Sequence, residues 1–209
     1  MPLEVNEIFS SIFGEGLNIG LPCTFIRLQG CNCRCTWCDT VYAQTTGLGT
    51  LMDEDSIVEK VKEFGNEWVC ITGGEPMMQD LHKLLVKLSS IHKKVQVETN
   101  GSLLLKDDEL ITRIAMSPKL PSSRMDKNMK YEQMMKLRPG DELKFVAANE
   151  SDWFFVKDLL RRYKVACEVI LQPEGGTDGG WLVEKLLTVG LEKVNARVLP
   201  QLHKVFGVK

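Results

Sequence analysis

The chain carries the stretch Gly30-Cys31-Asn32-Cys33-Arg34-Cys35-Thr36-Trp37-Cys38-Asp39-Thr40, which directly follows a predicted β-strand at residues 24–29. The spacing C-x3-C-x2-C gathers the thiols of Cys31, Cys35 and Cys38 in one compact loop. Cysteine thiolates hold iron–sulfur clusters, and a four-iron cluster with three such ligands keeps one iron open to another ligand. Barrel enzymes place their chemistry at the carboxyl ends of strands. The stretch therefore predicts a [4Fe-4S] site at the end of a strand.

A zinc site is the structural alternative for these cysteines, because zinc takes four tetrahedral ligands and could recruit Cys33 or a distant histidine (His82, His92 or His203). The chain has no second C-x2-C half, and its other cysteines, Cys23, Cys70 and Cys167, are isolated and typical of small buried core residues. Cys33 alternates with two ligands and is interpreted as a spectator. A non-catalytic iron–sulfur or zinc protein stays open at this point.

The rest of the chain alternates short β-rich runs with helical patterns, as βα units around a parallel sheet do. Six strands are predicted, at residues 24–29, 67–72, 94–99, 113–117, 142–147 and 166–172. Apolar residues at helical spacing predict helices over residues 57–64, 81–91 and 153–163, and a last helix that carries Trp181, Leu182 and Leu186. Residues 119–139 are predicted as loop with a marginal helix at 127–137. Six units are too few for a closed eight-unit barrel, so we expect one α/β domain over residues 1–209, an open partial barrel of (β/α)6 type.

Polar residues interrupt the apolar faces of the predicted strands at alternate positions: Arg27, Gln96, Glu98 and Lys144. Exposure at a sheet edge would explain any one of them. Buried charge is costly unless it is paired or bound to a ligand, so the four together predict a polar site inside the barrel.

Composition narrows the class of protein. Of the 209 residues, 44% are hydrophobic and 26% charged, with a formal net charge of −2. A chain with this small negative net charge lacks the excess of basic residues that proteins binding nucleic acids or membrane surfaces carry, so a small-molecule partner is favoured. The chain opens without a signal-like segment and has no apolar run of membrane-spanning length. Seven cysteines make an odd count that suits a reducing compartment, so a cytoplasmic location is expected.

A second motif, Ile71-Thr72-Gly73-Gly74-Glu75-Pro76, follows the next predicted strand. On its own it could be a strand-to-helix turn with Pro76 starting the helix. Together with C-x3-C-x2-C and the aromatic Trp37 before its last cysteine, it resembles the signatures of the radical S-adenosylmethionine (SAM) superfamily. That resemblance implies that the amino and carboxylate groups of SAM chelate the open iron, and that a reduced cluster splits the sulfonium to give a 5′-deoxyadenosyl radical.

The segment Asn6-Glu7-Ile8-Phe9-Ser10-Ser11-Ile12-Phe13-Gly14-Glu15-Gly16 resembles the opening of the 7-carboxy-7-deazaguanine synthase family. The resemblance spans almost the whole chain, through Arg27–Cys31, Glu98–Gly101, Ser117–Lys119, Lys144–Val146, Gln172–Pro173 and Gln201–Lys204. It implies a carbon–nitrogen lyase of queuosine and 7-deazapurine biosynthesis. Such an enzyme converts 6-carboxy-5,6,7,8-tetrahydropterin to 7-carboxy-7-deazaguanine with loss of ammonia.

Matching positions then imply roles. The implied substrate contacts are Ile12, Phe13, Gly14, Glu15, Arg27 and Thr72. The implied SAM contacts are Trp37, Cys38, Asp39, Gly74, Thr99, Ser117, Pro118, Lys119 and Gln172. Thr40 is implied as a ligand of Mg²⁺, which takes few protein oxygens. A carboxylate such as Glu15 suits the guanidine-like edge of a pterin, and the Arg27 fork suits its carboxylate. The resemblance also implies a reductant such as flavodoxin or ferredoxin, and a homodimer.

Alternatives accompany these assignments. Glu15 could be an ordinary loop carboxylate, Thr40 a helix cap and His203 a surface or core histidine. Phe13 stands where the family usually has Gln, so a side-chain contact there would be lost. The chain ends Gly207-Val208-Lys209, where some members use a terminal carboxylate in the site. A glycyl-radical activating enzyme shares C-x3-C-x2-C but acts on a protein partner.

Overall fold

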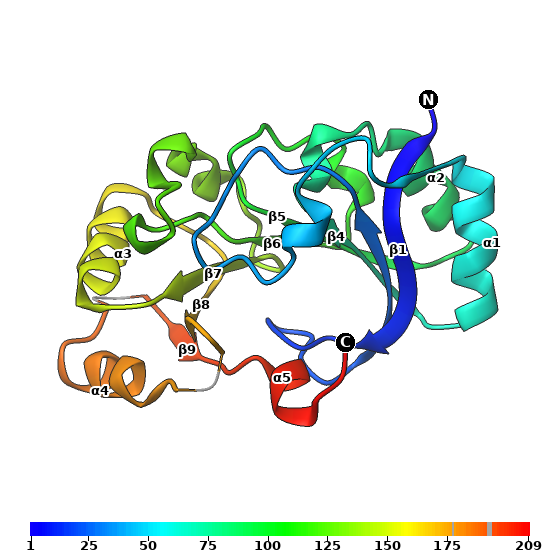
Figure 1. The fold of residues 1–209 in the computed structure, drawn as a ribbon. Coiled ribbons are helices and arrows are strands. Elements are labelled where there is room, and N and C mark those ends of the chain that lie inside the picture. The colour runs from blue at the N-terminus through cyan, green and yellow to red at the C-terminus, as the bar shows by residue number, and fades with distance from the viewer. Residues whose placement is uncertain (177, 192–193) are drawn as a thin grey trace.

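The computed structural model describes residues 1–176, 178–191 and 194–209. Its described strands form one nine-stranded sheet in the order β3-β1-β2-β4-β5-β6-β7-β8-β9. The strands are β1 (Leu3–Ile12), β2 (Pro22–Leu28), β3 (Thr50–Met52), β4 (Trp68–Gly73), β5 (Lys94–Thr99), β6 (Arg113–Met116), β7 (Glu142–Ala147), β8 (Glu168–Pro173) and β9 (Ala196–Val198). The sheet curves around a central hollow (Figure 1).

Helices cover the convex face of the sheet, at its outside in Figure 1. They are α1 (Glu54–Phe64), α2 (His82–Ser90), α3 (Glu150–Arg162) and α4 (Gly180–Thr188), followed by the short α5 (Leu202–Phe206). Helix α1 begins where the Asp53 carboxylate accepts the Ser56 amide at 2.7 Å, and it ends at Gly65 in the left-handed conformation. Apolar residues at helical spacing, among them Ile57, Leu84 and Trp153, are buried against the strands.

The six predicted strands are confirmed as β2, β4, β5, β6, β7 and β8, which pair in parallel. The prediction missed β1, which pairs antiparallel with β2, and the three-residue strands β3 and β9. A register shift between Val5 and Glu7 breaks the alternation of β1, so no period of two marks it in the sequence. Three residues are too few to show a period.

The marginal helix predicted at 127–137 is confirmed only in part, as 3-10 rather than α-helix. The structure has 3-10 helices there, at Pro121–Ser123, Asp126–Asn128 and Tyr131–Lys136, and none of the three carries a side-chain cap. Without capping hydrogen bonds, the short segment gains too little to form an α-helix. It packs instead through Gln133, whose amide donates to the carbonyls of Gly101 and Leu103.

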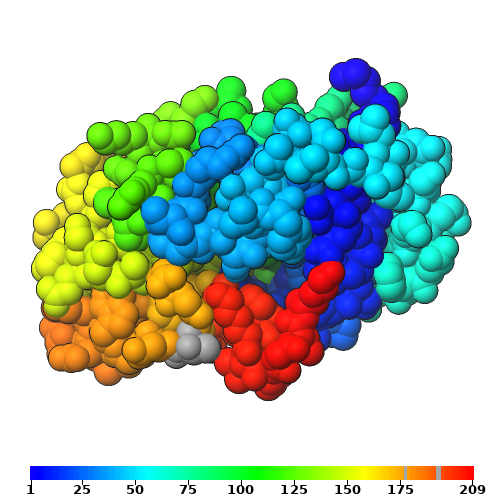
Figure 2. Space-filling model, viewed as in Figure 1, coloured from blue at the N-terminus to red at the C-terminus, as the bar shows by residue number. Residues whose placement is uncertain are grey.

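The edge strands of the sheet are β3, which pairs only with Leu3–Val5 of β1, and β9; residues 201–209 lie between β9 and the uncovered end of β1. The Leu202 amide donates to the Gly14 carbonyl at 2.7 Å, and the Ser11 hydroxyl donates to the Lys209 carbonyl. Figure 1 shows α5 between β9 and β1, and in Figure 2 its atoms lie against those of the N-terminal strand. We call residues 201–209 the closing segment. Among the described residues, no helix has the length and apolar character needed to cross a membrane.

Candidate active site

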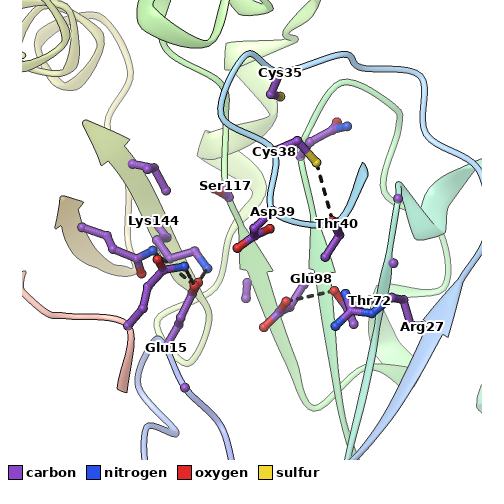
Figure 3. Close-up of a pocket in the computed structure, with 18 of the residues that line it drawn as sticks. Glu15, Arg27, Cys35, Cys38, Asp39, Thr40, Thr72, Glu98, Ser117 and Lys144 are labelled. Carbon is purple, nitrogen blue, oxygen red and sulfur yellow. Dashed lines mark hydrogen bonds and ion pairs between the residues drawn. The ribbon is translucent and has the colours of Figure 1, made fainter. Parts of the chain in front are cut away.

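A cavity of about 270 Å³ lies inside the barrel, between the cysteine loop, the strands and the closing segment. Every predicted site residue lines it except Phe13 and Pro118. Arg27, Glu98 and Lys144 also line it, as the polar strand positions predicted, whereas Gln96 lies outside the lining and accepts a hydrogen bond from Asn18 at 2.9 Å. The cavity thus brings together residues from both ends of the chain, from Phe9 to Lys209, and Figure 3 draws part of its lining.

The cysteine loop is held by its backbone. The Cys31 amide donates to the Gln44 carbonyl at 2.9 Å, and the Thr36 amide donates to the Ser123 carbonyl at 3.2 Å. The three predicted ligands are half-buried and line the cavity. A hydrogen bond from Cys33 lowers the pKa of the Cys31 thiol to about 7, against the opposing effect of burial. A thiol with a lowered pKa is suited to metal ligation.

These three cysteines fit an iron–sulfur cluster. In the described part of the chain, no three His, Cys, Asp or Glu side chains close on a single metal ion. A four-iron cluster is larger than one ion, so its thiolates stand apart around it, as three thiols facing one cavity do. Cys33 is buried, and its sulfur accepts the Asn100 side-chain amide at 3.5 Å. Its spectator role stays a prediction.

The Gly-Gly-Glu-Pro turn packs directly on this loop. A Cβ at Gly74 would collide with the carbonyl oxygens of Gly30 and Ala43, so only glycine allows the contact. Glu75 does not line the cavity; its buried carboxylate accepts from the Thr99 hydroxyl and the Asn100 amide, both at 2.7 Å. Burial raises the pKa of Glu75 although these hydrogen bonds oppose the rise. Glu75 therefore ties the turn after β4 to the turn after β5, a role that the sequence motif did not reveal.

Glu15 reaches into the barrel and is not an ordinary loop carboxylate. Its carboxylate pairs with Lys144 and accepts from the amides of Gln201 and of Gln172, the latter at 3.2 Å (Figure 3). Burial opposes ionisation, but the charge and hydrogen bond of Lys144 outweigh it and lower the pKa of Glu15 to about 2. Gln172 keeps its buried Oε1 without a partner in the described protein. Gln172 itself lines the cavity, so its unpartnered acceptor lies close to the space that a ligand would fill.

The neighbouring wall carries Thr72 and Arg27. The Thr72 hydroxyl donates to Glu98 at 3.0 Å, and Arg27 Nε donates to Glu7 at 2.9 Å. In Figure 3 the Arg27 side chain extends beside Thr72 and Glu98. Thr40, near the cysteines, makes no side-chain capping bond to the 3-10 helix that follows it. Thr40 does occupy the N-cap position of that helix, Val41–Ala43, but its hydroxyl lies 3.6 Å from Cys38 Sγ and the residue lines the cavity.

Phe13 and Pro118 fall outside the cavity. The Phe13 ring is buried in a small cluster with Cys23 and Cys70, edge-on to Phe25 at 5.7 Å between ring centroids. Its amide donates to Leu21 and its carbonyl accepts from Gly20, both at 2.8 Å. Both polar backbone groups of residue 13 thus close the 13–21 loop, which the sequence did not indicate. Pro118 lies between two residues that do line the cavity, Ser117 and Lys119.

The sequence also left some lining residues without a role. They include Phe9, Gln44, Asn100, Glu174, Gln201 and Lys209. For Gln201, the sequence did offer a clue, because the segment Gln201–Lys204 resembles the corresponding segment of the family. The histidine beside it, His203, lines the cavity against Gly14, where a Cβ would collide with the imidazole. His203 is therefore part of the site.

Comparison with known proteins agrees with this geometry. The family profile described as the radical SAM superfamily matches residues 25–142. A 7-carboxy-7-deazaguanine synthase of Thermoplasma acidophilum is 36% identical over 204 residues, covering 96% of this chain and 95% of its own. One from Aquifex aeolicus is 36% identical, covering 99% and 94%.

A solved structure confirms the fold. The crystal structure of QueE from Escherichia coli matches with a TM-score of 0.78 at 23% sequence identity, and the match covers 96% of this chain and 95% of that one. The predicted α/β partial barrel is thereby confirmed. The zinc and glycyl-radical alternatives find no support in these matches. The chain belongs to the radical SAM superfamily and, within it, to the family of 7-carboxy-7-deazaguanine synthases.

Proposed function

We propose that this chain converts 6-carboxy-5,6,7,8-tetrahydropterin to 7-carboxy-7-deazaguanine with release of ammonia, in queuosine or 7-deazapurine biosynthesis. Relatives matched over nearly their full length carry the name of this synthase. The observation that supports it most directly is the cavity itself, which joins the cysteine loop to Glu15, Arg27 and Thr72. A binding protein for iron–sulfur clusters alone would need no such enclosed polar chamber.

The cavity has a cofactor end and a substrate end. At the cofactor end, Cys31, Cys35 and Cys38 would hold the cluster, which when reduced supplies the electron that opens SAM to a 5′-deoxyadenosyl radical. Gly74, which has no side chain, lets the turn after β4 lie directly against the cysteine loop. Lys119 Nζ lies 5.7 Å from the centroid of the Trp37 ring. The proposed SAM contacts are Trp37, Cys38, Asp39, Gly74, Thr99, Ser117, Lys119 and Gln172, which line the cavity. The closing segment limits access of water to the radical.

At the substrate end, the chain's own residues bind and orient the pterin. Arg27 presents a fork that matches a carboxylate in bidentate fashion. Ile12, Gly14, Thr72 and Glu98 line this end of the cavity, so the backbones of the first two would flank the ring and the strand side chains would face it. The Glu15 carboxylate is paired with Lys144. It would therefore bind the ring edge while it keeps its ion pair with that lysine. This arrangement holds the reacting carbon against the cofactor end, which is the positioning that radical transfer requires.

Further parts of the proposal rest on the family. Thr40 would hold Mg²⁺, to which its hydroxyl could contribute one oxygen beside retained waters. A small electron carrier such as flavodoxin or ferredoxin would reduce the cluster. We propose that residues 1–209 act as one domain and that the protein works in the cytoplasm as a homodimer.

The test is anaerobic turnover by the reconstituted protein with SAM, Mg²⁺, a reductant and 6-carboxytetrahydropterin. We expect stoichiometric loss of the pterin, release of ammonia and appearance of 7-carboxy-7-deazaguanine, measured by liquid chromatography with mass detection. Formation of 5′-deoxyadenosine without consumption of the pterin would leave a radical SAM enzyme of another specificity and contradict the proposal.

A further inference from the structure

Glu7 on β1 is not among the predicted site residues, yet its carboxylate joins two cations from distant parts of the chain. Oε1 accepts from Arg27 Nε at 2.9 Å, and from the Tyr42 hydroxyl at 3.3 Å. Oε2 pairs with the ammonium of Lys209. Burial opposes the ionisation of Glu7, but the hydrogen bonds from Lys209 and Arg27 outweigh it and lower its pKa. Glu7 is thus held as a carboxylate at the meeting point of β1, β2 and the closing segment.

The contact with Glu7 fixes which part of Arg27 remains for a ligand. Within the part of the chain that the structure describes, Nε is the Arg27 atom that makes a hydrogen bond. Glu7 therefore binds the Nε side of the guanidinium and leaves the end that carries the two terminal nitrogens, Nη1 and Nη2, for a ligand. The rings of Phe9 and Tyr42 lie 5.7 and 5.9 Å from the Arg27 carbon Cζ. A guanidinium that contacts two aromatic rings and is tethered at Nε keeps its terminal fork in one orientation.

The same cluster of side chains includes the closing segment. Lys209 Nζ lies 4.9 Å from the centroid of the Phe9 ring, which also contacts Arg27, and the Lys209 carbonyl accepts from Ser11. Phe9, Arg27 and Lys209 all line the cavity. The Lys209 side chain is 64% exposed, whereas that of Arg27 is 14% exposed. Solvent screens the lysine pair far more than the arginine pair, so Arg27 is the stronger partner.

We propose that Glu7 is a positioning residue that aims the Arg27 fork at the substrate's carboxylate and ties the closing segment to that arginine. The inference rests on the proposed function, because the carboxylate to be recognised is the one on the pterin. It implies that Glu7 sets discrimination between pterins with and without a 6-carboxylate, since Glu7 acts on the group that reads this substituent. Glu7 takes no part in cofactor cleavage at the other end of the cavity.

The experiment measures KM and kcat for 6-carboxytetrahydropterin, together with the Ki of a tetrahydropterin that lacks the carboxylate, in Glu7→Ala, Glu7→Gln and Lys209→Met. We expect Glu7→Ala to raise KM about 10- to 100-fold, the range for loss of a charge-assisted hydrogen bond. Its kcat, its uncoupled SAM cleavage and the Ki should stay within about twofold. Glu7→Gln keeps an acceptor for Nε and should raise KM about 3- to 10-fold, and Lys209→Met about 2-fold, as for an exposed pair.

Glu67→Gln, which removes an exposed carboxylate paired with Lys94, is the matched control and should leave both constants unchanged. An equal rise in KM and in Ki would show a general structural role for Glu7 and overturn the inference. An unchanged KM in Glu7→Ala would overturn it as well, because Glu7 would then have no effect on substrate binding. If Glu7→Ala does not fold, the isosteric Glu7→Gln decides by the same comparison of KM with Ki. Failure of the wild-type protein to consume the pterin would instead overturn the proposed function, and with it the premise of this inference.

Discussion

The two ends of the cavity are constructed in different ways. At the cofactor end, ligands come from one short loop, and backbone hydrogen bonds such as Cys31 to Gln44 hold it. At the substrate end, side chains from distant segments hold one another: Glu15 pairs with Lys144, and Glu7 pairs with Lys209. The first end can lose a ligand and keep its fold. The second end carries buried charge whose partners are needed for stability, so its binding function and its folding are linked.

The sharpest test of this difference is at the cofactor end. Cys38→Ala should lose the cluster and all formation of 5′-deoxyadenosine, because two cysteines cannot hold the four-iron cluster. Its free energy of unfolding, measured in urea on the apoprotein, should match that of the wild type within about 0.5 kcal/mol, since Cys38 is half-buried. Iron and sulfide content and absorption of the anaerobically reconstituted protein provide the measurement.

Cys33→Ala is the matched control in the same loop. It should keep iron, sulfide and SAM cleavage, although it loses a buried sulfur and about 1 kcal/mol of folding free energy. Loss of the cluster in Cys33→Ala would make Cys33 a ligand and overturn its assignment as a spectator.

The same contrast explains what the sequence could predict. Local spacing revealed the three cysteines, the glycine turn and six parallel strands, because each of these features lies within a few consecutive residues. Strand β1 escaped because its bulge between Val5 and Glu7 breaks the alternation. The pairs of Glu15 with Lys144 and Glu7 with Lys209 join residues 129 and 202 positions apart. Their partners are fixed only when the barrel closes, so the sequence showed polar strand positions without showing which carboxylate each would meet.

The substrate end should respond through stability. Lys144→Met leaves the buried Glu15 carboxylate with amide donors alone, so we expect a loss of about 3–5 kcal/mol in the free energy of unfolding, as for a broken buried ion pair. Urea denaturation at pH 7 measures this loss. The double variant Glu15→Gln/Lys144→Met removes the orphaned charge and should recover part of it.

Lys204→Met is the control for Lys144→Met, because Lys204 also lines the cavity but lies 4.0 Å from a half-exposed Asp39. We expect it to cost less than about 1 kcal/mol. Equal losses in the two lysine variants would mean that the Glu15 pair is no more important to the fold than a surface contact, and the contrast between the two ends would fail.

A smaller effect than that of Lys144→Met is expected at Glu142, which does not line the cavity. This buried carboxylate at the start of β7 accepts the Leu17 amide at 2.6 Å and so supports the loop that carries Glu15. Burial raises the pKa of Glu142 to about 7, although the Leu17 amide and the charges of Lys144 and Arg113 oppose the rise. The folded protein therefore binds the Glu142 proton more tightly than the unfolded chain does.

This sign fixes the pH dependence. The stability contributed by protonated Glu142 is present below pH 4.5, the ordinary value for Glu, and is lost as the pH rises to about 7. Glu142→Gln keeps an acceptor for the Leu17 amide without the charge, so it should exceed the wild type in free energy of unfolding by up to about 3 kcal/mol at pH 8. The two proteins should converge near pH 4.5.

Free energies of unfolding from urea denaturation at pH 4.5, 6 and 8 measure this difference. Glu63→Gln on the exposed face of α1 is the control, because it makes the same charge change without burial. A gap between Glu142→Gln and the wild type that does not change with pH would mean that Glu142 stays ionised in the fold. Because the charge of Lys144 acts on Glu142, such a result would place a second permanent carboxylate, besides Glu15, within the field of that lysine. The loss expected for Lys144→Met would then increase, since that substitution would remove a favourable charge from two buried carboxylates in place of one.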